Sequence, residues 1–188
     1  MKPQELIEIL NVTGRLKTTL RHCDLNENRK ESVAEHCFRL SLFAMLLRDE
    51  FPDTDMDKVI KMCLIHDLGE AFTGDIPTFL KTQEDEKAEK EEFYGWIHTF
   101  PSAQKEEFLY LLKEIDELKT PEARLFKALD KLEAVISHNE SDISSWLPNE
   151  YELQLTYGSK EVEFSPYLCE LKKTIDLWTK EKISAEGK

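Results

Sequence analysis

Apolar side chains recur along most of this chain at the three- and four-residue spacing of a single helix face. Between residues 56 and 66, for example, Val59, Met62, Cys63 and His66 follow this spacing, so a buried helix face ends on a histidine. No segment shows the two-residue alternation of a half-buried strand, and the pattern therefore predicts an all-α fold without a sheet. The expected helices span about 4–20, from Ser32 to Pro52, from Thr54 or Asp55 to His66, from Lys81 to Ile97, from Pro101, from Pro121 towards His138, and from Pro166 to Lys180.

Several residues mark the ends of these helices. Ser32 followed by Glu35 forms a capping-box sequence at the start of the second helix. Gly69 is expected to cap the third helix in the left-handed conformation. Two segments are expected to lie outside helices, Leu20–Arg29 as a loop rich in polar residues and Ser144–Pro148 as an interruption.

The composition fits one soluble, helix-rich domain. The chain has 188 residues, of which 40% are hydrophobic and 34% charged, and only six are Gly. There is no internal repeat and no Gly- or Ser-rich linker. We therefore expect a single domain over residues 1–188, with a core from about 4 to 180 and a frayed tail at 181–188.

The charge and the cysteines limit the partners and the location. The formal net charge of −13 disfavours long nucleic acids, whose binding depends on neutralising phosphates. A small phosphate ester is still compatible, because a metal ion and a few local cations can outweigh the global field. The sequence shows no apolar signal region and no stretch long enough to span a membrane. The four cysteines are scattered, which favours reduced thiols and a cytoplasmic location.

Metal-capable side chains occur at three separated places. His66 and Asp67 are adjacent and can reach one ion if they lie at a helix end, where the backbone turns them together. His36 lies on the apolar stripe of the preceding helix. Asp130 has the apolar neighbours Phe126 and Ala134 one turn away, and a buried carboxylate of this kind needs a charged partner or a metal ion. Lys127 and Lys131 leave a buried ion pair as the alternative for Asp130.

This ordered set of His36, His66–Asp67 and Asp130, together with Glu70 and Gly74–Asp75, resembles the signature of the HD-domain metal-dependent phosphohydrolases. The resemblance covers roughly residues 10–160 and is nearest to the branch that contains the 5′-deoxynucleotidases. It implies a single HD-domain helical bundle, metal ligation by these four residues and a homodimer. Two imidazoles and two carboxylates suit one divalent transition metal ion, which leaves Mn, Co, Ni, Zn and Fe open.

The resemblance also implies a reaction. The expected activity is release of phosphate from (deoxy)nucleoside 5′-monophosphates by attack of a metal-activated water. In related nucleotidases the position of Glu70 is a catalytic carboxylate, and that of Asp75 positions the substrate or protonates it. From the residues alone, Glu70 could equally be a charge at a helix end, and Asp75 a turn or cap residue.

Candidate cations for the substrate phosphate precede the first ligand, namely Arg15, Arg21 and Arg29. The related deoxynucleotidases carry an Arg-Trp pair in this region, and the Trp helps to exclude a 2′-hydroxyl. Here Arg15–Leu16 is taken as the best-matching pair. This assignment predicts weaker discrimination between ribo- and deoxyribonucleotides, with Arg21 or Arg29 as substitutes for the missing contact.

Three other functions remain as alternatives. A dinuclear HD phosphodiesterase or iron oxygenase needs two more histidines between Asp67 and Asp130, where only His98 is present. A hydrolase of guanosine polyphosphates has an acidic pair after the His-Asp pair, whereas here Gly69 precedes Glu70. A nucleotide-binding regulatory module without turnover typically lacks some of the ligands. The segment around Trp146 and Tyr157 is expected to be exposed and compatible with a dimer.

Overall fold

The computed structural model describes residues 1–25 and 29–185, which form helices and one small antiparallel hairpin. The α-helices are α1 Pro3–Thr13, α2 Val33–Leu46, α3 Met56–Ile65, α4 Glu70–Thr73, α5 Gln83–Ile97, α6 Ser102–Glu117, α7 Pro121–Glu140, α8 Glu150–Thr156 and α9 Pro166–Ala185. The strands are β1 Leu20–Leu25 and β2 Arg29–Ser32, and short 3-10 turns occur at Gly14–Lys17, Arg48–Glu50 and Ile143–Ser145. The predicted helical fold is confirmed.

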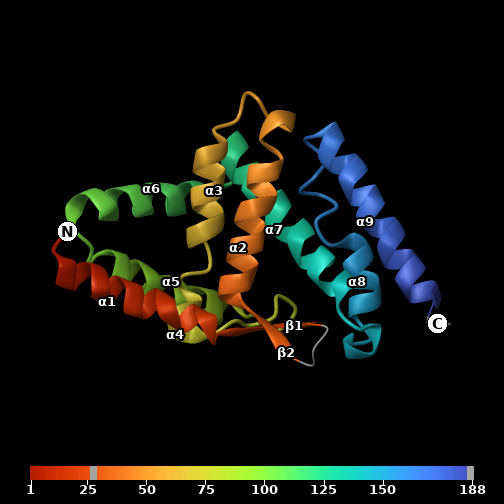
Figure 1. Ribbon diagram of the computed structural model, residues 1–188, viewed down its shortest axis with the longest axis horizontal. Helices are drawn as coiled ribbons and strands as arrows, with labels where there is room; N and C mark the ends of the chain where they lie inside the picture. Colours follow the sequence, from red (N-terminus) through yellow and green to blue (C-terminus); the bar gives the residue numbers. More distant parts are fainter. Residues whose placement is uncertain (26–28, 186–188) are drawn as a thin grey trace.

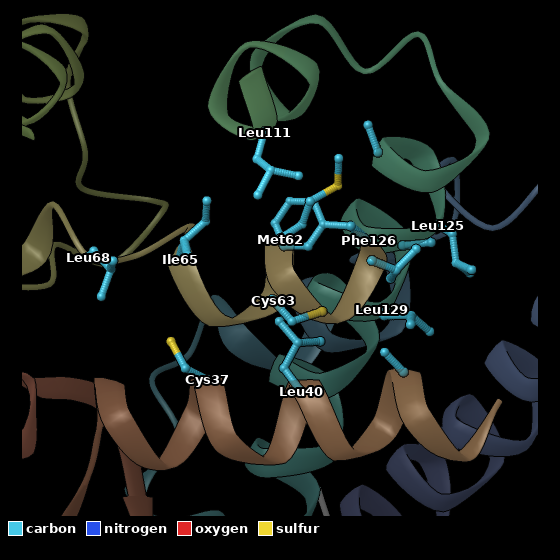
Figure 2. Packing of buried hydrophobic residues seen from close by; sticks show 14 of the residues in the cluster. Cys37, Leu40, Met62, Cys63, Ile65, Leu68, Leu111, Leu125, Phe126 and Leu129 are labelled. Atoms are coloured by element: carbon cyan, nitrogen blue, oxygen red, sulfur yellow. The ribbon is translucent and has the colours of Figure 1, made fainter. Parts of the chain in front are cut away.

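Helices α2, α3 and α7 pack against one another at the centre of the molecule (Figure 1). Helices α8 and α9 lie on one side of this centre, and α1, α4, α5 and α6 on the other. The side chains between the central helices are fully buried, among them Leu40 of α2, Met62 of α3 and Leu129 of α7 (Figure 2). The helices that carry the predicted metal ligands therefore lie at the hydrophobic core of the fold.

Side chains close the starts of the two helices that lead to the site. Ser32 caps α2 by accepting a hydrogen bond from the Glu35 amide, and the Glu35 carboxylate accepts one from the Ser32 amide at 2.9 Å. Of the two cap candidates for α3, Asp55 is the one used, since its carboxylate accepts the Lys58 amide hydrogen at 3.0 Å. These caps satisfy amides that a helix leaves free at its first turn.

The expected loop at Leu20–Arg29 was wrong, as was the absence of a sheet. Strand β1 pairs antiparallel with β2, with Asp24 opposite Lys30 and Leu25 opposite Arg29. Asn26 to Asn28 lie outside the described residues. The strands lack apolar alternation because their inward-facing side chains form ion pairs, as Arg21 does with Glu31 at 2.7 Å. Buried charged residues do not produce the alternation of apolar and polar positions from which a strand is predicted.

Two helix ends also differ from the prediction. Helix α1 stops at Thr13 and continues only as a 3-10 turn, and α2 stops at Leu46, well before Pro52. The third helix does end at His66, but Gly69 is right-handed with φ −59° and precedes α4. A Cβ at Gly69 would lie 3.2 Å from side-chain atoms of Glu89 and Phe93, so a larger residue here would require these side chains to shift. The glycine with positive φ in this region is Gly74, with φ +79°, at the end of α4.

The C-terminal part contains one helix more than the sequence indicated. Helix α8 follows the predicted interruption, and α9 continues to Ala185, beyond the expected end at Lys180. Residues 186–188 lie outside the described part. Within residues 1–25 and 29–185, every helix is too short or too polar to traverse a lipid bilayer.

Candidate metal centre and adjoining pocket

The four predicted ligands come together although they lie far apart in the sequence. His36 lies on α2, His66 and Asp67 lie at the end of α3, and Asp130 lies on α7. Asp67 Oδ2 is 3.0 Å from His66 Nε2 and 3.8 Å from His36 Nε2. Asp130 Oδ1 is 3.6 Å and 3.4 Å from the same two nitrogens. Each of the two carboxylates thus lies within 4 Å of both Nε2 atoms.

The imidazoles point towards this centre with unpaired nitrogens. The Nδ1 atom of His66 lies 3.0 Å from the Cys63 carbonyl oxygen, and that of His36 lies 2.5 Å from Glu133 Oε2. Both Nε2 atoms are buried and have no hydrogen-bond partner among the described residues. Two buried nitrogens left unpaired beside two carboxylates fit a divalent cation, whose charge the carboxylates would balance.

The environment keeps both carboxylates ionised. Burial opposes ionisation of Asp67, but the charge and hydrogen bond of His66 outweigh it and lower the pKa of Asp67 to about 2. For Asp130, the charge of Lys127 likewise overcomes burial and holds the pKa well below its usual range. Lys127 Nζ lies 2.8 Å from Asp130 Oδ2, which leaves Oδ1 towards the imidazoles. Lys131, the other candidate partner, pairs with Glu161 instead.

Glu133 contacts the predicted ligand His36, although the sequence pattern does not single it out. It is 1% exposed, and besides His36 it binds Arg39 Nε at 2.6 Å. Glu31 and Glu133 could form a second acidic group with His36, but Arg21 lies between them, 2.7 Å from Glu31 and 3.6 Å from Glu133. This second group is therefore an ion-pair cluster. Glu133 lies three residues, about one helix turn, after Asp130, and this spacing was the sequence signal that could have indicated its place beside the ligands.

Glu70 and Asp75 border the centre from α4 and the segment after it. Glu70 is 6% exposed, and its Oε2 atom has no hydrogen-bond partner in the described part of the chain. Burial, together with the negative charges of Asp67, Asp75 and Glu89, raises the pKa of Glu70 to about 10. A divalent cation held by Asp67 would oppose this shift. Burial also raises the pKa of Asp75, while the charge of Arg21 opposes that change.

Of the three candidate arginines, the structure brings only Arg21 beside the ligands. Burial disfavours its charged form, but Glu133, Glu31, Asp67 and Asp130 outweigh this and raise its pKa. Arg29 pairs with Glu35 at the surface. Arg15 packs on α4, with its guanidinium 5.8 Å from the Phe72 ring centre.

This arrangement changes the comparison with the Arg-Trp pair. Leu16 is 4% exposed and belongs to the hydrophobic core, so the expectation based on Arg15–Leu16 has no structural support. The residue that follows Arg21 is His22, which lines a pocket.

This pocket lies beside Arg21 and Asp75, and none of the four predicted ligands lines it. Arg21 and Asp75 form its near end, and Ala134 and His138 line it at successive turns of α7 after Asp130. Residues four apart share a helix face, so the pocket extends from the ligands along α7. The other lining residues are His22, Cys23, Pro77, Thr78, Phe79, Glu150, Leu153, Gln154 and Tyr157.

Comparison with known proteins assigns the family. The sequence model described as an HD domain matches residues 13–172 of this chain. The chain belongs to the HD domain family. Among curated HD-domain relatives, 5′-deoxynucleotidase HDDC2 of Dictyostelium discoideum is 31% identical over 169 residues, covering 84% of this chain and 89% of that protein. The human protein of the same name is 26% identical over 187 residues, covering 97% and 90%.

Solved structures share the fold of this HD domain. A protein from Magnetospirillum magnetotacticum, described as a predicted metal-dependent phosphohydrolase, superposes with a TM-score of 0.78 at 24% identity over 95% of each chain. A conserved hypothetical protein from Pyrococcus furiosus superposes with a TM-score of 0.70 at 28% identity, covering 90% of this chain and 98% of its own. The helical arrangement of this chain thus recurs in solved structures.

Replacing Glu133 should weaken metal binding. The Glu133 carboxylate accepts the Nδ1 hydrogen of His36 and so leaves Nε2 with a free lone pair towards the centre. In Glu133→Gln the amide can donate to Nδ1 instead, which favours the tautomer that carries its hydrogen on Nε2. We expect metal affinity to fall about 10- to 100-fold, the usual effect of losing such support.

The measurement is competition between the protein and a chelator of known affinity. Glu140→Gln is the control, because Glu140 binds the same Arg39 at the surface without contacting His36. Equal metal affinity of Glu133→Gln and the wild type would show that Glu133 does not orient His36.

Proposed function

We propose that this HD-domain protein is a metal-dependent nucleotidase that releases phosphate from nucleoside 5′-monophosphates. The observation that carries this proposal is the pair of buried, unpaired Nε2 atoms of His36 and His66, which face Asp67 and Asp130 beside an open pocket. The curated relatives are named 5′-deoxynucleotidases, which supports the substrate class.

The residues around the centre have complementary roles in this reaction. His36, His66, Asp67 and Asp130 would hold a divalent ion, which would supply an activated water and polarise the phosphoryl group. Arg21 balances the charge of the substrate phosphate. Glu70 accepts the proton of the attacking water as the new phosphorus–oxygen bond forms. The bond from phosphorus to the ester oxygen breaks, and Asp75 gives its proton to that oxygen.

The stoichiometry and assembly are also proposals. We propose one ion per chain, because His98, the spare histidine, is exposed at the end of α5. We further propose a single domain, a cytoplasmic homodimer and no nucleic-acid polymer as a partner. Trp146 does not support a dimer surface as expected, since it is 6% exposed and its indole nitrogen donates to the His138 carbonyl oxygen at 3.1 Å.

A panel of nucleotides tests the proposed activity. We expect the metal-loaded protein to release phosphate from 2′-deoxyadenosine 5′-monophosphate and to leave the 3′-monophosphate of the same nucleoside largely intact, because the pocket extends from the centre in one direction. The measurement is the initial rate of phosphate release, with chelator-treated protein as the control. The same panel compares the ribose and deoxyribose forms. This comparison measures the sugar discrimination directly, without the expectation derived from Leu16. Absence of release from every 5′-monophosphate would contradict the proposal.

A further inference from the structure

The far end of the pocket contains a group of side chains that the proposed reaction does not use. Glu150 Oε1 lies 3.1 Å from His138 Nε2 and 3.4 Å from His22 Nε2. These residues come from α8, α7 and β1, which lie far apart in the sequence. Two imidazoles that share one carboxylate, with a side-chain exposure of only 2% for Glu150, form an organised polar wall.

The Glu150 carboxylate indicates which nitrogen of His22 is available to a ligand. Burial disfavours ionisation of Glu150, but its bonds with His138 and with the Leu147 amide outweigh it and lower the pKa of Glu150. The ionised carboxylate lies 3.4 Å from His22 Nε2, and this proximity favours the tautomer that carries its hydrogen on that nitrogen. Its Nδ1 atom, which makes no hydrogen bond within the described residues, is then an acceptor.

The length of the pocket indicates which part of a nucleotide reaches this wall. His138 follows Asp130 by eight residues on α7, which corresponds to about 12 Å along the helix axis. A phosphate at the metal centre therefore places the sugar near the small side chain of Ala134 and the base near His22 and His138. This distance is too long for the sugar hydroxyls to be the main contact of the far wall.

Flat and apolar side chains flank the same region. Phe79 packs edge-on against the His22 ring, with ring centres 5.6 Å apart, and Leu153 and Tyr157 also line the pocket. The Tyr157 hydroxyl lies 3.3 Å from the Thr78 hydroxyl, which links α8 to the segment before α5. Bases outside a duplex are commonly bound by apolar and aromatic packing together with hydrogen bonds to their edges.

We propose that the wall formed by His22, His138 and Glu150 is a nucleobase subsite in which His22 Nδ1 accepts a hydrogen from the amino group of the base. The ligands are nucleotides of adenine or cytosine, which carry an amino group where hypoxanthine and uracil carry a carbonyl oxygen. This inference rests on the proposed nucleotidase function. Glu150 and His138 act as positioning residues, because they hold the His22 ring.

Two matched substrate pairs test the subsite. The 5′-monophosphates of deoxyadenosine and deoxyinosine differ at this group, and so do those of deoxycytidine and deoxyuridine. We expect kcat/KM to favour the amino member of each pair by about five- to tenfold, the effect of one hydrogen bond. His22→Phe keeps a ring against Phe79 but removes the acceptor, so the ratio should fall to near one.

His98→Phe is the control, because it makes the same chemical change at an exposed histidine outside the pocket. It should keep the wild-type ratio. A wild-type ratio near or below one, or an unchanged ratio in His22→Phe, would overturn the subsite. Failure of the proposed function is distinguishable from both, since it would appear as no phosphate release from any of the four nucleotides.

Discussion

Asp130→Asn is expected to lose bound metal and turnover together. The substitution leaves Asp67 as the only carboxylate facing the two imidazoles, so a divalent ion is no longer neutralised. It also leaves the Lys127 ammonium, now 2.8 Å from Asp130 Oδ2, without its anionic partner beside the ion. Loss of a residue that only supports a ligand typically lowers metal affinity about 10- to 100-fold. We expect a larger fall for Asp130→Asn.

Metal content after gel filtration and the rate of phosphate release measure this effect on the same samples. Asp57→Asn is the control, because Asp57 pairs with Arg48 on the surface of α3. Circular dichroism shows whether each variant is folded. A folded Asp130→Asn protein with wild-type metal content would mean that Asp130 forms only the buried ion pair with Lys127.

Glu70→Gln should separate catalysis from metal binding. Glu70 is buried beside Asp67, but its Oε2 atom is unpaired, so it is free to take the proton of an attacking water. We expect the variant to keep its metal while kcat falls about 10²- to 10⁴-fold, the usual contribution of a general base. Glu92→Gln, at an exposed position of α5, should behave as the wild type.

Near-full activity of Glu70→Gln with its metal retained would remove Glu70 from the mechanism. Glu70 would then be only a buried charge at the start of α4, and Asp75 would become the candidate for both proton transfers. Loss of metal from Glu70→Gln would instead place Glu70 among the ligands.

The clustering of the four predicted ligands could be anticipated because His36 and His66 follow helical periodicity. His36 and His66 lie on apolar stripes, so the sequence places both of them inside the fold, and both are buried. The adjacent pair His66–Asp67 requires a helix end, and α3 does end there. In each case a local rule of helix geometry was sufficient.

The surroundings of the centre were not predictable in the same way. Arg21 lies on a strand that has no apolar alternation. That Arg21 rather than Arg15 lies beside the predicted ligands depends on tertiary packing. Glu133 lies one turn after Asp130, but sequence spacing alone does not distinguish a buried partner of His36 from a surface charge. His22, His138 and Glu150 come from β1, α7 and α8, and their proximity depends on the tertiary fold.

The most direct test of the metal-dependent reaction is reconstitution of the wild-type protein. The protein is stripped of metal with a chelator, and Mn²⁺ or Co²⁺ is then added stepwise. Bound ion per chain and the rate of phosphate release from 2′-deoxyadenosine 5′-monophosphate are measured at each step. We expect no turnover in the stripped protein and a rate that rises with bound ion until one ion per chain is reached. Full turnover without metal, or a rate that saturates only at two ions per chain, would contradict the mononuclear centre.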